Sequence, residues 1–232
     1  MFSLVIPIHN EAENIQKLIE QIYNSLKTYK NFELVIVNDA STDNTIKIIS
    51  DLKKKYNIVL LNNFINKGQS FSITKGIKES KNEIIITLDG DGQNNPKDIP
   101  ILLKYYMQNK NISLVGGIRK KRIDSFIKII SSKIANNIRS RILDDKCDDT
   151  GCSLKVFSRS VFLKFPYFDG IHRFLPALFR GYSYECFYIN VDHRAREKGI
   201  SKYGTIDRLY KGIIDIIKVR KIIKDYKIKK LL

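Results

Sequence analysis

Cysteines, long apolar runs and a signal peptide are scarce or missing in this sequence of 232 residues. The three cysteines, Cys147, Cys152 and Cys186, are an odd number without a metal-type CxxC pair, which argues against a disulfide framework and favours a reducing, cytosolic location. No run approaches the ~18 apolar residues of a spanning helix, and the opening MFSLVIP lacks a basic and a long apolar region. Because no spanning helix precedes Leu232, we expect membrane contact to be peripheral or supplied by a partner protein.

Acidic residues are too few in the second half of the chain to balance the basic ones. Residues 1–100 hold 12 Lys+Arg and 12 Asp+Glu, whereas residues 101–232 hold 29 and 12, so the whole excess of +17 lies in the second half. This asymmetry suggests a polyanionic partner, with nucleic acid, anionic lipid head groups and a phosphate-bearing substrate as candidates. The sequence lacks a helix-turn-helix, zinc or RNA-binding signature. We therefore expect no nucleic-acid partner, and a basic nucleic-acid-binding protein remains only an alternative.

The first half shows an alternation of strand and helix signals. Short apolar runs predict strands, and apolar residues at helical spacing predict the segments between them. We predict strands over 2–8, 32–37, 58–61, 83–88 and 112–115, with helices over 11–29, 43–54, 69–79 and 96–107. Strands separated by helices favour an α/β fold with a mostly parallel sheet flanked by helices.

The second half is less regular and more basic. We predict a basic amphipathic helix over 124–142, strands over 153–157 and 184–191, and a helix from Thr205 to about Val219 that continues into a basic tail. The apolar stripe of this last helix contains Ile206, Leu209, Tyr210, Ile213, Ile214 and Ile217. Such stripes beside many lysines suit an anionic membrane surface, or else the core or an oligomer interface. We expect three parts: a nucleotide-sugar-binding half (1–116), an acceptor-binding half (117–204) and a basic amphipathic C-terminal helix (205–232) in peripheral membrane or oligomer contact.

Three polar clusters follow predicted strands, at residues 9–11, 38–39 and 89–93. Ligands of parallel sheets sit at the carboxyl ends of the strands, so the clusters are expected to converge. Asp89 and Asp91, one residue apart on a turn with Gly90 and Gly92, can both face one hard cation such as Mg²⁺ or Mn²⁺, and Gln93 can add an oxygen. We call residues 89–93 the acidic loop and predict a metal and diphosphate site there.

The clusters resemble a known family. Residues 5–11 (VIPIHNE), 37–45 (VNDASTDNT) and 89–96 (DGDGQNNP) are similar to the ordered motifs of family 2 glycosyltransferases, which have the GT-A fold. Residues 149–155 (DTGCSLK) and 196–203 (REKGISKY) resemble motifs of the dolichol-phosphate-mannose synthase branch. The resemblance implies transfer of a sugar, with inversion, from a UDP- or GDP-sugar to a polyprenyl phosphate such as undecaprenyl phosphate, for envelope glycan or lipopolysaccharide modification.

The resemblance also implies roles for individual residues. The nucleotide-sugar site would contain Pro7, His9, Glu11, Asn38, Asp39, Asp89, Gly90 and Asp91, and the metal would be held by Asp89, Asp91 and Gln93. The acceptor phosphate would be bound by Lys128, Ser132, Asp149, Arg196 and Ser201. The residues implied to act in catalysis are Asp91, Arg119, Arg196 and Lys202.

A phosphate oxygen is already anionic near neutral pH and hardly needs a general base, so basic residues must instead bring two anions together. We interpret His172 and His193 as structural or surface residues. The expected location is the inner face of the cytoplasmic membrane, with a homo-oligomer possible. The alternative enzyme is a family 2 glycosyltransferase with a soluble glycan or protein acceptor.

Overall fold

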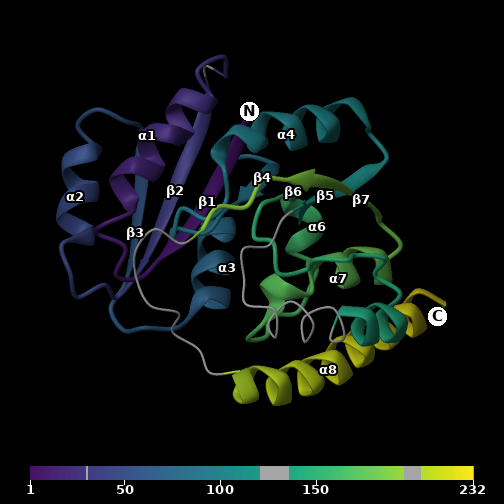
Figure 1. The fold of residues 1–232 in the computed structure, drawn as a ribbon. Helices are drawn as coiled ribbons and strands as arrows, with labels where there is room; N and C mark the ends of the chain where they lie inside the picture. The colour runs from purple at the N-terminus through teal and green to yellow at the C-terminus, as the bar shows by residue number, and fades with distance from the viewer. Residues whose placement is uncertain (30, 121–135, 196–204, 232) are drawn as a thin grey trace.

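The computed structural model describes residues 1–29, 31–120, 136–195 and 205–231, with side chains of the last segment described from residue 212 to 230. A seven-stranded sheet in the order β3-β2-β1-β4-β6-β5-β7 runs through its centre (Figure 1). The strands are β1 (Phe2–Ile8), β2 (Phe32–Asp39), β3 (Ile58–Asn63), β4 (Ile84–Thr87), β5 (Ile112–Arg119), β6 (Lys155–Ser158) and β7 (Glu185–Val191). Strand pairs are parallel except those of β6, which confirms the predicted mostly parallel α/β sheet.

Strand β6 is antiparallel to both of its neighbours, β4 and β5. Lys155 at its start lies opposite Thr87 at the end of β4. The segment that enters β6 therefore lies beside the segment that leaves β4. This single reversal of direction brings residues 149–155 against the acidic loop, although more than 55 residues separate them in the sequence.

Helices cover both faces of the sheet. One face carries α1 (Ile15–Ser25), α2 (Thr45–Leu52) and α4 (Ile99–Gln108), with the 3₁₀ turn η1 (Pro96–Asp98) before α4. The other carries α3 (Gln69–Glu79), α6 (Arg159–Phe162), the 3₁₀ turn η2 (Ile171–Arg173) and α7 (Leu175–Gly181). Side chains of β1 alternate between the two cores, with Leu4 and Ile6 in the first and Val5 in the second. A strand buried on both faces needs this continuous apolar run.

The C-terminal helix α8 (Thr205–Leu231) lies along the second face, drawn in yellow at the lower edge of Figure 1. The helix continues past Val219 through the basic tail, in line with the C-terminal helix expected over 205–232. Val219 and Ile223 are buried against the core, and the ring of Tyr226 stacks on Tyr182 with centroids 3.7 Å apart. The apolar anchor of α8 therefore lies towards its C-terminal half.

The predicted stripe of α8 lies outside the core where its side chains are described. Ile213, Ile214 and Ile217 are 54%, 47% and 65% exposed. A helix is also present over residues 136–143, and the rest of the helix predicted over 124–142 lies outside the described residues. Within the described part of the chain, no helix is long and apolar enough to span a bilayer.

Candidate active site

Asp89 opens the acidic loop at the end of β4, where it is partly buried. Its Oδ1 accepts a hydrogen bond from Nε2 of Gln69 at 2.7 Å, and its backbone N–H donates to Oγ of Ser153 at 3.1 Å. Burial, together with the neighbouring Asp91 carboxylate, raises the pKa of Asp89 to about 6, and Lys155 offsets part of that effect. Two carboxylates that destabilise each other's charge form a site that a cation would stabilise.

The turn of the acidic loop depends on its glycines and on Gln93. A Cβ on Gly90 would lie 2.6 Å from Cγ2 of Ile8, and Gly92 has a φ of +74°, a region that favours glycine. The Gln93 backbone N–H donates to Oδ1 of Asp91 at 3.1 Å, and its Nε2 donates to the carbonyl of Arg194 at 3.4 Å. This orientation directs the amide nitrogen of Gln93 to Arg194 and leaves its amide oxygen available as a metal ligand.

The loop after β1 is bonded to the loop after β2. The backbone N–H of Asn10 donates to Oγ of Ser41 at 2.9 Å, and Oδ1 of Asn10 accepts the backbone N–H of Thr42 at 2.7 Å. The backbone N–H of Glu11 donates to Oγ1 of Thr45 at 2.9 Å. The first two sequence motifs therefore form one bonded unit, as their convergence at the sheet edge predicted.

The carboxylate of Asp39 connects a third loop, residues 63–68, to this unit. It accepts hydrogen bonds from Nδ2 of Asn63 at 2.8 Å and from the backbone N–H groups of Lys67 and Gly68 at 2.9 and 2.8 Å. Nδ1 of His9 lies 2.7 Å from the Asp39 carbonyl oxygen. The predicted contact of Asp39 with a nucleotide stays a prediction. The structure shows a second role, because the hydrogen bonds of Asp39 hold the conformation of residues 63–68.

Asn38 is buried beside Asp39 and uses its amide inside the protein. Its Nδ2 donates to Oδ1 of Asn62 at 3.1 Å, while its Oδ1 accepts the backbone N–H of Ser41 at 3.2 Å. Only 1% of the residue is exposed. Its predicted role at the nucleotide-sugar site stays a prediction, and the bonds seen here make Asn38 a support for the strand-end loops.

On the acceptor side, Arg119 and Asp149 form a bidentate ion pair. Nε and Nη2 of Arg119 donate to the two carboxylate oxygens of Asp149 at 2.6 and 2.7 Å. Gly151 makes room for the guanidinium, because a Cβ there would lie 2.9 Å from Nη2. Oγ of Ser153 donates to Oδ1 of Asn94 at 2.6 Å. The structure thus joins Arg119 to Asp149 and Ser153 to the acidic loop, while the predicted roles of Arg119 in catalysis and of Asp149 at the acceptor phosphate stay predictions.

Arg139 holds the 144–150 segment in place, a role that the sequence did not reveal. It is 5% exposed, its Nε donates to Oδ2 of Asp145 at 2.6 Å, and its Nη1 donates to Oγ1 of Thr150 at 2.6 Å. Nη2 also donates to the carbonyl of Cys147. In the sequence Arg139 is one of many basic residues on a predicted helix, and no local signal separates it from an exposed one.

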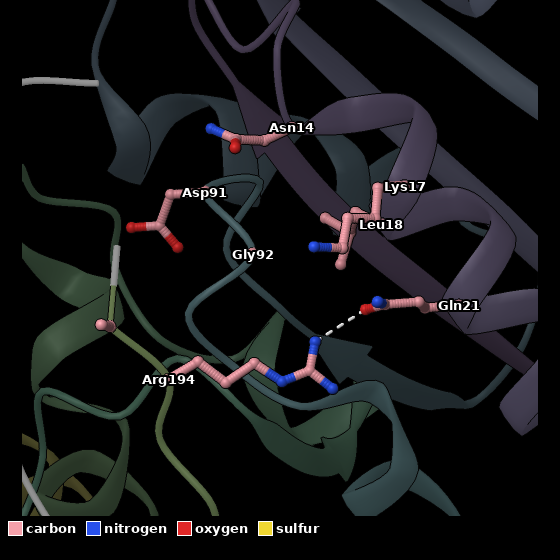
Figure 2. Close-up of a pocket in the computed structure, with 8 residues that line it drawn as sticks. Asn14, Lys17, Leu18, Gln21, Asp91, Gly92 and Arg194 are labelled. Atoms are coloured by element: carbon pink, nitrogen blue, oxygen red, sulfur yellow. Dashed lines mark hydrogen bonds between the residues drawn. The ribbon is translucent and has the colours of Figure 1, made fainter. Parts of the chain in front are cut away.

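Arg194 closes the other side of the acidic loop, and it too was missed. Its guanidinium donates to Oε1 of Gln21 at 2.8 Å and to Oδ1 of Asn95 at 2.6 Å. A small pocket lies here between α1 and the loop, with Lys17 and Asp91 among its lining residues (Figure 2). The signal that could have identified Arg194 is its position just after the predicted strand 184–191.

The structure does not describe several of the predicted site residues. Lys128, Ser132, Arg196, Ser201 and Lys202 lie outside the described residues. Among the described residues, no cluster of three or more His, Cys, Asp or Glu side chains forms a metal site. The metal candidate remains the oxygen set of Asp89, Asp91 and Gln93, which offers two carboxylates and one amide.

Similarity to known proteins agrees with this geometry. The model of glycosyl transferase family 2 matches residues 3–167, well over half of the chain. The chain belongs to glycosyl transferase family 2. This family membership confirms the resemblance that the ordered motifs carried.

Two relatives of this family 2 chain are named as enzymes that act on polyprenyl phosphates. The chain is 36% identical over 225 residues to dodecaprenyl-phosphate galacturonate synthase of Rhizobium johnstonii, covering 94% of this chain and 65% of the relative. It is 33% identical over 207 residues to undecaprenyl-phosphate 4-deoxy-4-formamido-L-arabinose transferase of Pectobacterium carotovorum, covering 87% and 62%. The chain therefore spans just under two thirds of the length of these relatives.

Solved structures show that the fold is shared more widely. Glucosyl-3-phosphoglycerate synthase of Mycobacterium tuberculosis, in complex with Mn²⁺, uridine diphosphate and glucosyl-3-phosphoglycerate, superposes with a TM-score of 0.70 at 14% identity, covering 94% of this chain and 78% of that one. Mannosyl-3-phosphoglycerate synthase of Rubrobacter xylanophilus gives 0.72 at 12% identity, covering 95% and 73%. These neighbours confirm the GT-A architecture of the family 2 chain.

Proposed function

We propose that this protein transfers a sugar from a nucleotide-diphosphate sugar to a polyprenyl phosphate, with undecaprenyl phosphate as the expected acceptor and envelope glycan modification as the purpose. The observation that carries the proposal is the direct contact between the acidic loop and residues 149–155, made by the antiparallel strand β6. Relatives named as polyprenyl-phosphate synthases and transferases support the acceptor class.

A divalent cation, Mg²⁺ or Mn²⁺, fits the acidic loop. Asp89 and Asp91 would hold it with Gln93, because Gln69 binds only one oxygen of Asp89 and the Gln93 amide presents its oxygen. Burial and the adjacent Asp91 carboxylate raise the pKa of Asp89, and a bound cation would offset both effects. When bound, such an ion neutralises the charge of the departing nucleotide diphosphate.

The protein's own residues orient the two substrates. We infer that Pro7, His9, Glu11 and Asp39 line the nucleotide at the ends of β1 and β2. The guanidinium of Arg119, held by Asp149, stays fixed beside the acidic loop and can stabilise the charge that develops on the leaving diphosphate. The nucleophile is an anionic phosphate oxygen, so the site has to position charge rather than remove a proton. Attack opposite the leaving group inverts the anomeric carbon.

A direct activity assay tests this proposal. Wild-type protein is incubated with Mn²⁺, undecaprenyl phosphate and labelled UDP- or GDP-sugars, and the label is followed into an organic phase. Asp91→Ala should abolish transfer, and Asp51→Ala, which changes an exposed carboxyl on α2, should leave it unchanged. Lack of a metal-dependent lipid product from every common donor would refute the proposal. A labelled product that stays in the aqueous phase would favour the soluble-acceptor alternative.

We also propose that α8 places the protein on the anionic inner face of the cytoplasmic membrane. Ile213, Ile214 and Ile217 are exposed, while basic side chains follow along the same helix. An apolar stripe beside lysines binds both the acyl boundary and the head groups of anionic lipids. The excess positive charge of the acceptor half also favours binding to anionic lipids.

Liposome flotation tests the membrane contact. Ile217→Glu should weaken association with phosphatidylglycerol vesicles, and Met107→Glu, an equally exposed apolar position on the opposite face of the sheet, should not. Binding should also fall with added salt, because screening weakens surface electrostatics. Retention of both variants in the soluble fraction at low salt would contradict the proposal. If sedimentation shows a wild-type dimer that the Ile217→Glu variant does not form, the stripe belongs instead to a homo-oligomer interface.

A further inference from the structure

Two polar residues, Lys155 and His172, lie near the end of β4 on the face of the sheet covered by α3 and α7. Successive side chains of a strand point to opposite faces. In β6, Val156 belongs to the first core and Phe157 to the second, so Lys155 points with Phe157 towards α3 and α7. A lysine at that position is unusual, since the surrounding core is apolar and aromatic.

Lys155 is only 3% exposed and forms no ion pair with any described residue. Its ammonium donates to the carbonyl oxygens of Thr150 and Cys152. An ammonium has three N–H donors, so one donor is left after these two bonds. A buried cation without a carboxylate is costly unless an anion offsets its charge. Asp89 is the carboxylate on whose pKa Lys155 acts, yet its charge is already opposed by burial and by Asp91.

His172 faces the same region from η2. Its Nδ1 lies 2.8 Å from Oγ of Ser70, and that hydroxyl oxygen accepts the backbone N–H of Gly170 at 2.7 Å. The Ser70 hydroxyl has one proton and no other described acceptor, so it donates to Nδ1 and leaves the His172 proton on Nε2. Nε2 has no partner among the residues that the structure describes. His172 therefore has one N–H donor that no described residue accepts.

The imidazole is a donor rather than a base. Burial lowers the pKa of His172 to about 3, with further lowering from the positive charges of Arg173 and Lys155. Ser70, its partner, directly follows Gln69, which binds Asp89 at 2.7 Å. His172 and Lys155 therefore both lie near the start of the acidic loop, on the same face of the sheet.

We propose that His172 Nε2–H and the Lys155 ammonium form a binding site for a phosphate oxygen of the reacting substrates. This inference rests on the proposed function and deepens it. A neutral donor and a buried cation suit an anionic oxygen, because a charge-assisted hydrogen bond is shorter and stronger than a neutral one. The oxygen belongs either to the acceptor phosphate or to the donor diphosphate, and the two sources are separable by experiment.

Two substitutions distinguish substrate binding from a structural role of His172. The amide nitrogen of glutamine replaces Nε2–H, whereas the shorter amide of asparagine can replace only the bond to Ser70. We expect His172→Asn to weaken phosphate binding about tenfold or more and His172→Gln to stay within about threefold of wild type, as the loss of one charged hydrogen bond implies. A purely structural role predicts the reverse order.

Nuclear magnetic resonance with ¹⁵N-labelled histidine supplies a readout independent of turnover. The chain has 3 histidines, so loss of one signal in His172→Asn assigns the residue. We expect the Nε2–H tautomer in the free protein and a shifted signal on adding farnesyl phosphate, for an acceptor site, or UDP with Mg²⁺, for a donor site. If neither probe shifts the signal, or if His172→Asn binds both as tightly as wild type, the inference is wrong.

The inference and the proposed function can fail separately. A shifted His172 signal without any lipid product would leave the phosphate site intact and overturn only the proposed transfer reaction. A lipid product with unchanged KM values in His172→Asn would overturn only the phosphate site. Lys155→Met should weaken binding of the same probe that shifts the His172 signal, and if that variant does not fold, the two His172 variants still decide.

Discussion

Replacing Asp89 by asparagine should raise the free energy of unfolding of the metal-free protein. The same change should remove the stabilisation that a bound divalent metal would give. The pKa of this carboxyl is raised from 3.8 to about 6 by burial and by Asp91. Such a rise corresponds to ~3 kcal/mol against folding when the group is ionised, and partial exposure reduces the expected gain to on the order of 1–2 kcal/mol. Asparagine keeps the oxygen that accepts from Gln69, so the hydrogen bond survives and the charge is lost.

The pH dependence gives the sharper test. Because the folded-state pKa of Asp89 is raised, its favourable contribution is complete below pH 3.8 and is lost as the pH rises through about 6. Urea unfolding in EDTA should therefore show Asp89→Asn more stable than wild type at pH 7.5 and nearly equal at pH 4. Asp51→Asn, an exposed carboxyl on α2, serves as the control and should show no gain. An Asp89→Asn variant that is unchanged or weaker at pH 7.5 would refute the reasoning.

Three further outcomes follow from buried groups elsewhere. Arg139→Met should lower the free energy of unfolding by ~3–5 kcal/mol in urea titrations, because Asp145 is 0% exposed and would keep an unpaired charge; a loss below ~1 kcal/mol would contradict this. Gly181→Ala should lower it by ~1–3 kcal/mol and loosen α8 in hydrogen exchange, since a Cβ there would lie 2.5 Å from Ile223; unchanged exchange would contradict the packing. Cys147, whose thiol pKa burial raises to about 12, should react with iodoacetamide only after unfolding, and rapid labelling of native protein would show otherwise.

The strands and the sheet edge were predictable because their signals are local. Apolar runs such as residues 2–8 need burial on both faces, and the polar residues that follow them mark the ligand edge. The resemblance implied roles for Arg119 in catalysis and for Asp149 at the acceptor phosphate, which stay predictions, and the structure adds that the two residues form a bidentate ion pair.

Contacts that depend on how distant segments approach could not be read from the sequence. Gln69 and Asp89 meet because α3 begins beside the end of β4, and Arg194 meets Gln21 across 173 residues. The extension of α8 beyond its predicted apolar stripe depends on such a contact as well. Its last turns are rich in lysine, and the packing of Ile223 against Gly181, rather than local amphipathicity, keeps them helical.

The loop at residues 63–68 has a consequence for the kinetics of ligand capture. The backbone N–H groups of Lys67 and Gly68 are bonded to the Asp39 carboxylate, so the protein itself holds the shape of this loop without a contact from a nucleotide. Binding then requires little loss of chain entropy at this edge. Association should be limited by encounter rather than by slow ordering, so the observed rate in stopped-flow should rise linearly with nucleotide concentration. In an Asp39→Ala variant the observed rate should instead saturate with nucleotide concentration, because ordering of the loop would then limit binding.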